Sequence, residues 1–153
     1  MDDIIIRKAT TDDLPSLLEF EQGIIKFERP YDPTLEEDPI SYYDLGALIK
    51  SENAEVLVAE HNEKIVASGY AKIKRARHYL DHENYSYLGF MFTRPEFRGK
   101  GINKKIIEVL RGWSLSRGLK EIRLTVYDDN VGAIKAYEKT GFKKHLIEMR
   151  LIE

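Results

Sequence analysis

The chain has 153 residues, of which 42% are hydrophobic and 33% charged, a balance typical of one globular domain that we expect to span residues 1–153. Its 24 Lys and Arg against 26 Asp and Glu give a net charge of -2, which argues against a nucleic-acid partner. No cysteine is present, which excludes thiolate catalysis and zinc sites built on cysteine.

The N-terminus does not resemble a signal peptide. Acidic Asp2 and Asp3 stand where a signal peptide carries basic residues, and the apolar run at residues 4–6 is short. No apolar run in the chain approaches the ~18 residues that a membrane span needs. We therefore expect a cytoplasmic protein with no membrane partner.

The first third of the chain predicts one strand and two helices. Residues 4–7 are typical of a strand, and the polar cluster at residues 10–13 with Pro15 behind it is typical of a helix start. Apolar residues at helical spacing continue this first helix. Residues 28–38, rich in proline and acid, predict a surface loop, and residues 42–49 predict a second short helix.

The middle of the chain changes to the period of two that is typical of strands. Residues 56–59 and 65–73, joined by the turn residues 61–64, predict a hairpin. A third strand is predicted over residues 85–93, and Arg94-Pro95 ends it.

The last third predicts two more helices and two more strands. They are a helix over residues 102–113 that ends by Gly118, a strand over 122–126, a helix from 130 to 137 and a last strand over 142–152. The order is β-α-α-β-β-β-α-β-α-β. It predicts an α/β (α+β) domain in which helices cover a mixed sheet.

The most informative segment is Thr93 to Asn103, where a strand leads through a glycine-containing turn into a helix. Such a junction directs free backbone N–H groups and the positive end of a helix dipole at one spot. Gly99 and Gly101 permit close approach of a ligand to the backbone. Five basic residues against one acid between Arg94 and Lys105 favour an anionic ligand. The alternative is an ordinary strand-to-helix turn with solvated lysines.

Two blocks in this order resemble the GNAT superfamily of acyl-CoA-dependent N-acetyltransferases. Arg98-Gly99-Lys100-Gly101, after a strand and Pro95, is similar to the superfamily's pyrophosphate loop. Residues 130–142, an Asn-capped helix that carries Tyr137 and closes on Gly-Phe, resemble its C-terminal signature. With residues 6–15 the resemblance covers nearly the whole chain. Asn103 departs from the pattern, because the family's loop ends there in a small residue.

The resemblance implies a mostly antiparallel mixed sheet flanked by helices, and acetyl-CoA as co-substrate. It implies that backbone N–H groups hold the pyrophosphate, namely those of Arg98, Gly99, Lys100, Gly101, Ile102 and Asn103. Backbone groups of Met91, Phe92 and Thr93 would pair with the pantetheine arm like an added strand. Asn130 would hydrogen-bond the same arm, although capping its own helix is the alternative role.

Catalysis by this chemistry needs an acid and a base. The resemblance implies that Tyr137 protonates the departing thiolate, whereas spacing alone equally fits a core aromatic residue. For the base that deprotonates the acceptor amine, Glu83 is the first candidate and Glu28 the second, with solvated surface acids as the alternative for both. His78 and His82 lack an obvious third ligand, so no metal is expected.

The function expected is transfer of an acetyl group from acetyl-CoA to a primary amine by direct attack, with no covalent enzyme intermediate. The acidic residues between Glu28 and Asp38 favour a cationic amine as the small-molecule or peptide acceptor. Two alternatives stay open: a catalytically silent acyl-CoA-binding sensor or partner-binding module with the same fold, and a nucleotide-phosphate protein that uses the same turn. A homodimer through the last strand or the helices is compatible with the family, and no sequence feature decides it.

Overall fold

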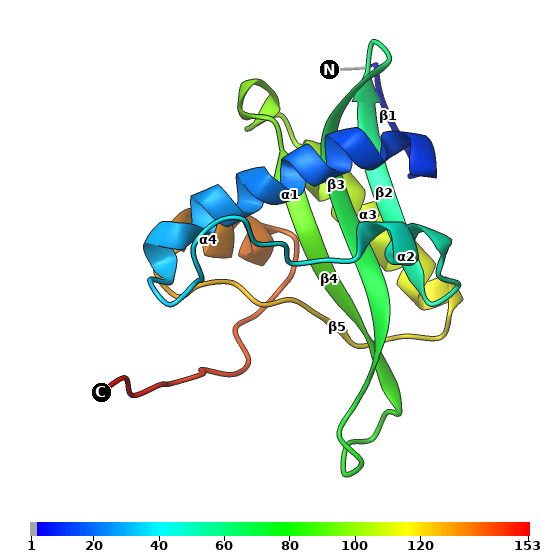
Figure 1. The fold of residues 1–153 in the computed structure, drawn as a ribbon. Helices are drawn as coiled ribbons and strands as arrows, with labels where there is room; N and C mark the ends of the chain where they lie inside the picture. The colour runs from blue at the N-terminus through cyan, green and yellow to red at the C-terminus, as the bar shows by residue number, and fades with distance from the viewer. Residues whose placement is uncertain (1–2) are drawn as a thin grey trace.

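The computed structural model describes residues 3–153 and is built around one five-stranded sheet in the order β1-β2-β3-β4-β5 (Figure 1). The strands are β1 (Ile4–Lys8), β2 (Ala54–His61), β3 (Lys64–Arg75), β4 (Asn84–Thr93) and β5 (Ile122–Arg123). Pairing is antiparallel from β1 to β4 and parallel between β4 and β5. The predicted mixed, mostly antiparallel sheet is therefore confirmed.

Helices cover both faces of this sheet. One face is covered by α1 (Leu14–Glu28) and α2 (Leu45–Lys50), and the other by α3 (Ile102–Ser116), while α4 (Val131–Lys139) follows β5 (Figure 1). The first core layer includes Leu17, Phe20, Ile24, Leu45, Val56, Val58 and Phe90. The second includes Leu57, Val66, Leu88, Ile102, Ile106 and Leu110. Burial of these two layers is what holds the helices to the sheet.

Helix α2 begins later than the sequence pattern predicts. The side chain of Asp44 caps it by accepting a hydrogen bond of 3.1 Å from the Ala47 backbone N–H. Tyr42 and Tyr43 therefore precede the helix, in the segment that crosses the sheet, and are free to turn their rings toward it.

The last predicted strand is not formed. Residues 142–152 carry the alternating pattern of a strand, but the chain beyond Gly141 is irregular and pairs with no strand among residues 3–153. A strand needs a neighbour for its backbone hydrogen bonds, and in this single chain the segment lies away from the sheet (Figure 1). The expectation of a strand over 142–152 is wrong for the isolated chain.

The described residues include no helix long and apolar enough to cross a membrane. The cytoplasmic location stays a prediction.

An ion-pair network ties the N-terminal strand to the start of α1. The Arg7 guanidinium donates to both carboxylate oxygens of Asp13, at 2.8 and 2.9 Å, and to Glu60 on β2 at 2.7 Å. Asp13 is only 7% exposed and also accepts from the Thr10 backbone N–H at 2.8 Å. The hydrogen bonds from Arg7 lower the pKa of Asp13, so the network stabilises the fold while Asp13 is ionised.

We expect Asp13→Asn to lower the free energy of unfolding at pH 7 by about 2 kcal/mol, because charge-assisted hydrogen bonds to a buried group are lost. Since the folded pKa of Asp13 lies below its unfolded value of about 3.9, wild type should lose this contribution as the pH falls below that value. The variant should lack that part of the acid dependence. Urea unfolding between pH 7 and pH 3 measures both.

Glu19→Gln is the control, because Glu19 is 65% exposed where it pairs with Arg94. It should change stability by less than about 0.5 kcal/mol. Equal losses in the two variants would contradict a structural role for the Arg7–Asp13 pair.

Candidate functional site

A bulge in β4 opens one edge of the sheet. Ser68 pairs with Phe92 and Tyr70 pairs with Gly89, so β4 contains one more residue than β3 across this interval. Phe90 takes up the extra residue with φ of 57°, a conformation that large side chains rarely adopt, and its carbonyl accepts a 3.0 Å hydrogen bond from the buried Ser68 hydroxyl.

The bulge separates β4 from β5. Pairing between these strands is restricted to Ser86 with Ile122 and Tyr87 with Arg123. Beyond Tyr87, β4 has no strand partner on this side within the described part of the chain. Its backbone N–H and C=O groups are therefore available to a ligand that lies along the strand.

The loop after β4 forms a second open set of backbone groups. Gly99 and Gly101 have φ of 75° and 80°, which only glycine adopts without strain. Gly101 precedes α3 and offers no capping side chain, so the first N–H groups of that helix face outward with the positive end of its dipole. Arg98 donates from its Nε to the Thr93 carbonyl at 3.0 Å, which holds the loop against the end of β4.

The two open sets of backbone groups follow each other directly in the chain. Ile102 is buried and fixes the start of α3 on the sheet, whereas Asn103 is half-exposed beside it. The predicted pyrophosphate loop thus has the backbone geometry of an anion site.

The side chains of the other predicted site residues on β4 and α4 have structural roles: those of Met91 and Phe92 pack in the core, and that of Asn130 caps a helix. The Phe92 ring stacks on Phe20 with centroids 4.6 Å apart, and Met91 packs toward the α3 face. Asn130 caps α4, since its side chain accepts a 3.2 Å hydrogen bond from the Ala133 N–H. The backbone of residues 91–93 is what remains for a ligand, as the resemblance implies.

Tyr137 on α4 lies beside the open edge. Its ring packs against Phe142 with centroids 5.9 Å apart. Burial, with smaller contributions from the charges of Glu28 and Tyr87, raises its pKa to about 12. The phenol is therefore protonated near neutral pH and can donate a hydrogen bond, and the raised pKa makes it a weaker acid than an exposed tyrosine.

Glu28, the last residue of α1, is the carboxyl that lies near Tyr137. Its charge contributes to the raised pKa values of Tyr42, Tyr43, Tyr127 and Tyr137, which places it among these hydroxyls. Burial also raises the pKa of Glu28 itself. The Tyr42 hydroxyl lies close to this carboxyl: burial and their interaction raise the pKa of Tyr42, and the interaction partly offsets the effect of burial on the pKa of Glu28.

Glu83, the first candidate base, lies elsewhere. It is exposed at the end of the loop between β3 and β4, which extends away from α4 (Figure 1). Its neighbours around an open hollow are Arg75, Ala76, Arg77, His78, Leu80, Asp81 and His82. The structure does not bring Glu83 together with Tyr137. Residues 3–153 also contain no group of three His, Asp or Glu placed to hold a metal ion.

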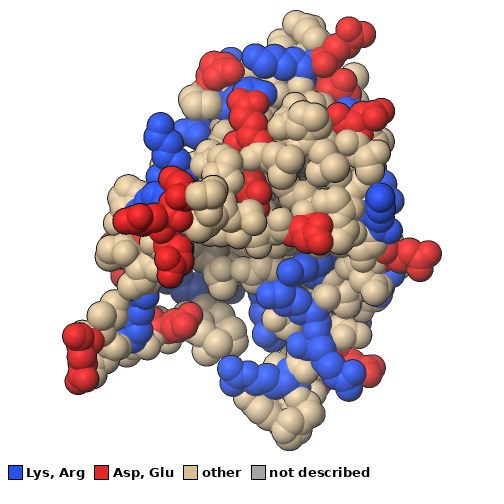
Figure 2. Space-filling view, in the orientation of Figure 1, with Lys and Arg blue, Asp and Glu red and all other residues tan. Residues whose placement is uncertain are grey.

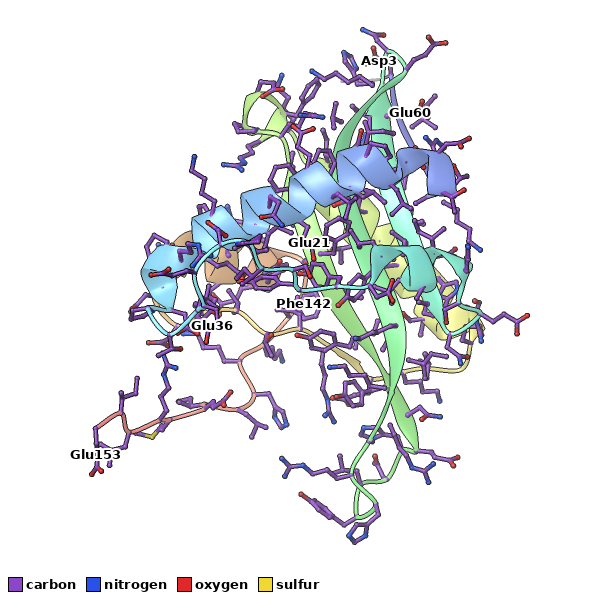
Figure 3. All side chains as sticks on the ribbon, viewed as in Figure 1. Asp3, Glu21, Glu36, Glu60, Phe142 and Glu153 are labelled. Carbon is purple, nitrogen blue, oxygen red and sulfur yellow. The ribbon has the colours of Figure 1, made fainter. Side chains whose placement is uncertain are left out.

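Sequence reasoning missed Glu21. This residue is only 1% exposed, and its Oε2 accepts hydrogen bonds from the backbone N–H groups of Tyr42 and Tyr43 at 2.7 and 2.8 Å. Figure 3 shows it pointing from α1 toward the crossing segment that precedes α2. Glu21 thus holds the two tyrosines over the sheet; the only signal in the sequence is an acid on the apolar stripe of α1.

Basic side chains gather below α2, on the face of the sheet that α1 and α2 cover (Figure 2). Lys74 places its Nζ 3.9 Å from the Tyr87 ring centre, and the Arg123 guanidinium lies 4.2 Å from the Tyr85 ring centre. Burial and the neighbouring Lys74 lower the pKa of Lys72. Lys72 lines an open hollow of about 320 Å³ with Tyr42, Tyr43, Asp44, Ala47, Leu48 and Ser51.

The acidic loop that favoured a cationic acceptor is partly neutralised. Arg29 binds the Asp38 carboxylate at 2.7 Å and donates to the Glu36 carbonyl at 2.8 Å. Glu36, Glu37 and Asp38 are exposed on the outer side of the loop.

Comparison with known proteins agrees with this geometry. Residues 21–142 match the model of the Acetyltransferase (GNAT) family. The chain is 27% identical over 152 residues to a Sus scrofa protein named thialysine N-epsilon-acetyltransferase, across 92% of this chain and 85% of that one.

Solved structures share the fold. A tetramutant of the BH1408 protein from Bacillus halodurans has a TM-score of 0.84 and 22% identity, across 97% of this chain and 99% of that chain. A Clostridium acetobutylicum protein described as a predicted acetyltransferase, solved with acetyl-CoA, has a TM-score of 0.71 and 19% identity, across 97% and 96% of the two chains. The chain therefore belongs to the GNAT family, and its enzyme class is that of the acetyl-CoA-dependent N-acetyltransferases.

Proposed function

We propose that this enzyme transfers the acetyl group of acetyl-CoA directly to a primary amine, with no covalent enzyme intermediate. The observation that carries the proposal is the open edge of β4, which continues into the uncapped start of α3 and lies beside the protonated phenol of Tyr137. The absence of cysteine supports direct transfer, because the commonest acyl-accepting nucleophile is missing.

The open backbone groups fit acetyl-CoA. The N–H groups from Arg98 to Asn103 suit a pyrophosphate, and the glycine conformations at 99 and 101 leave the backbone exposed to it. The free edge of β4 suits an amide-bearing arm that pairs as an added strand. Acetyl-CoA supplies the acetyl thioester, and an N–H of residues 91–93 would polarise its carbonyl.

Tyr137 and Glu28 take the proton-transfer roles. Tyr137 is protonated at neutral pH and donates to the departing thiolate a hydrogen bond that strengthens as negative charge develops on the sulfur. We propose Glu28 rather than Glu83 as the base, because Glu28 lies among the tyrosines near Tyr137 and its raised pKa makes it a better proton acceptor than an exposed carboxylate.

The acceptor we propose is a small amine that also carries an anionic group. Lys72 lines the hollow, and Lys74 and Arg123 lie over the rings of Tyr87 and Tyr85. The pKa of Lys72 is lowered by burial and by Lys74, so a bound anion would relieve both costs. The Sus scrofa relative is named for acetylation of thialysine, which supports a small amine.

For the proton-transfer roles we expect Tyr137→Phe to lower kcat by about 100-fold with acetyl-CoA affinity unchanged, because the variant lacks only the proton donor. Glu28→Gln should lower kcat by a similar factor and remove the acidic limb of the kcat/KM profile. That limb should lie above the usual carboxyl range in wild type, since activity falls as Glu28 becomes protonated and its pKa is raised. Steady-state kinetics from pH 5 to pH 9 measure these effects.

Glu83→Gln is the matched control and should behave as wild type. Loss of activity in Glu83→Gln with activity retained in Glu28→Gln would reverse the assignment of the base. Unchanged kcat in Tyr137→Phe would rule out the phenol as the acid. No turnover by wild type with any amine would instead favour the catalytically silent module.

For the acceptor we expect wild type to prefer lysine to lysine amide, which differ in the carboxylate. Lys72→Met should raise the KM for lysine by about tenfold, leave the KM for acetyl-CoA unchanged and remove the preference, because the cation facing the anionic group is lost. Lys26→Met, at an exposed position on α1, is the control. A wild-type preference for lysine amide would contradict an anionic acceptor.

A further inference from the structure

A lysine of the chain itself lines the hollow that we propose for the acceptor. Lys72 on β3 forms part of its wall together with Tyr42 and Tyr43. Lys72 is half-buried, whereas every other lysine of residues 3–153 except Lys74 is exposed. The enzyme therefore holds a primary amine of its own in the place where it would bind the amine that it acetylates.

The side chain of Lys72 lies toward the bulge in β4. Its Nζ is 5.7 Å from the ring centre of Tyr70, two residues earlier on the same face of β3. Tyr70 pairs with Gly89, and its hydroxyl and Cζ lie 2.7 Å from the position that a Cβ on Gly89 would occupy. Phe90, the bulge residue, comes next in the chain. The amine is thus directed toward the part of β4 whose N–H groups would polarise the thioester carbonyl.

The hollow and the bulge share a wall formed by Tyr43. Its ring centre lies 5.6 Å from that of Tyr70 and 5.3 Å from that of Phe90. The same tyrosine lines the hollow with Lys72, and Glu21 fixes its backbone through a hydrogen bond of 2.8 Å. An amine in the hollow and a thioester at the bulge are therefore next to each other.

The ammonium group of Lys72 lacks a partner that would keep it charged. It forms no ion pair with a carboxylate among residues 3–153. Asp44, the acid that lines the same hollow, uses its Oδ1 to cap α2. Burial and the neighbouring Lys74 lower the pKa of Lys72, so a larger fraction of it is in the neutral form that attacks a thioester.

We propose that the enzyme acetylates its own Lys72 when acetyl-CoA is bound and the acceptor site is empty. The neutral Nζ attacks the thioester carbonyl, a carbon–nitrogen bond replaces the carbon–sulfur bond, and the sulfur of coenzyme A gains the proton that the nitrogen loses. Donor and amine are held by one chain, so the transfer is intramolecular. The proposal rests on the direct acetyl transfer proposed above but not on the identity of the acceptor.

Acetylation of Lys72 removes the cation that we assign to the anionic group of the acceptor. The amide product is neutral, so the modified enzyme binds an anionic acceptor more weakly. A bound acceptor has the opposite effect, because its anionic group keeps Lys72 protonated and unable to attack. The modification thus lowers activity where acetyl-CoA is abundant and the acceptor is scarce.

Peptide mapping by mass spectrometry, after incubation of wild type with acetyl-CoA and no added amine, tests the modification. Lys72 should gain its acetyl group at least about tenfold faster than Lys26, an exposed lysine on α1, because Lys72 is held near the thioester. The rate per chain should not change with enzyme concentration. Equal rates at the two lysines overturn the proposal, and a rate at Lys72 that rises with enzyme concentration overturns transfer within one chain.

Competition for the co-substrate site separates enzymatic from chemical acetylation. An excess of free coenzyme A should slow the reaction at Lys72 and leave that at Lys26 unchanged. Gly101→Val, at low acetyl-CoA concentration, should have the same selective effect. A rate at Lys72 that neither change affects would show reaction with free acetyl-CoA in solution, which overturns the proposal.

Kinetics with an added amine separate this proposal from the proposed function. Wild type incubated beforehand with acetyl-CoA should have a KM for lysine raised about tenfold, as in Lys72→Met, and the same incubation should not change Lys72→Met further. Transfer to an added amine with Lys72 left unmodified would overturn self-acetylation and leave the proposed function intact. Absence of both reactions would contradict both proposals. Acetylation of Lys72 without transfer to any added amine would support self-acetylation and contradict only the proposed acceptor.

Discussion

The bulge at Phe90 is the constraint on which the rest of the site depends. One extra residue in β4 turns the strand away from β5 after Tyr87, so that backbone groups normally used inside a sheet are left for a ligand. The left-handed conformation of Phe90 is unfavourable by itself and is held by the buried ring packing and by the Ser68 hydrogen bond to its carbonyl. The same divergence gives Tyr137 its place beside β4.

Two acids on α1 show how burial divides structural from chemical roles. Glu21 is fully buried and both of its contacts are backbone N–H groups, so its carboxylate is used entirely in holding Tyr42 and Tyr43. Glu28, two turns later, is desolvated among tyrosine hydroxyls, and its raised pKa leaves it able to accept a proton. Their different surroundings, rather than their type, determine what each contributes.

The local sequence pattern predicts much of the fold. The features that it does not predict depend on contacts between segments that are distant in the sequence. The hairpin at residues 56–73 and the loop at Gly99 and Gly101 were predictable, because alternation and left-handed glycines act locally. The bulge was not, since it is defined by the register of β4 against β3. On the sequence alone Glu83 is placed ahead of Glu28 as the candidate base, because the burial that favours Glu28 depends on packing that the sequence does not reveal. Residues 142–152 have the pattern of a strand but pair with no strand among the described residues 3–153.

Calorimetric titration with acetyl-CoA tests most directly whether the opened edge and the loop form the co-substrate site. Wild type should bind one acetyl-CoA per chain and bind ADP and NAD much more weakly, because they lack the arm that pairs with β4. Gly101→Val should weaken binding by at least about tenfold, since φ of 80° is strained for a β-branched residue, whereas Gly112→Ala within α3 should bind as wild type. No binding of acetyl-CoA by wild type, or equal binding by Gly101→Val, would contradict the account.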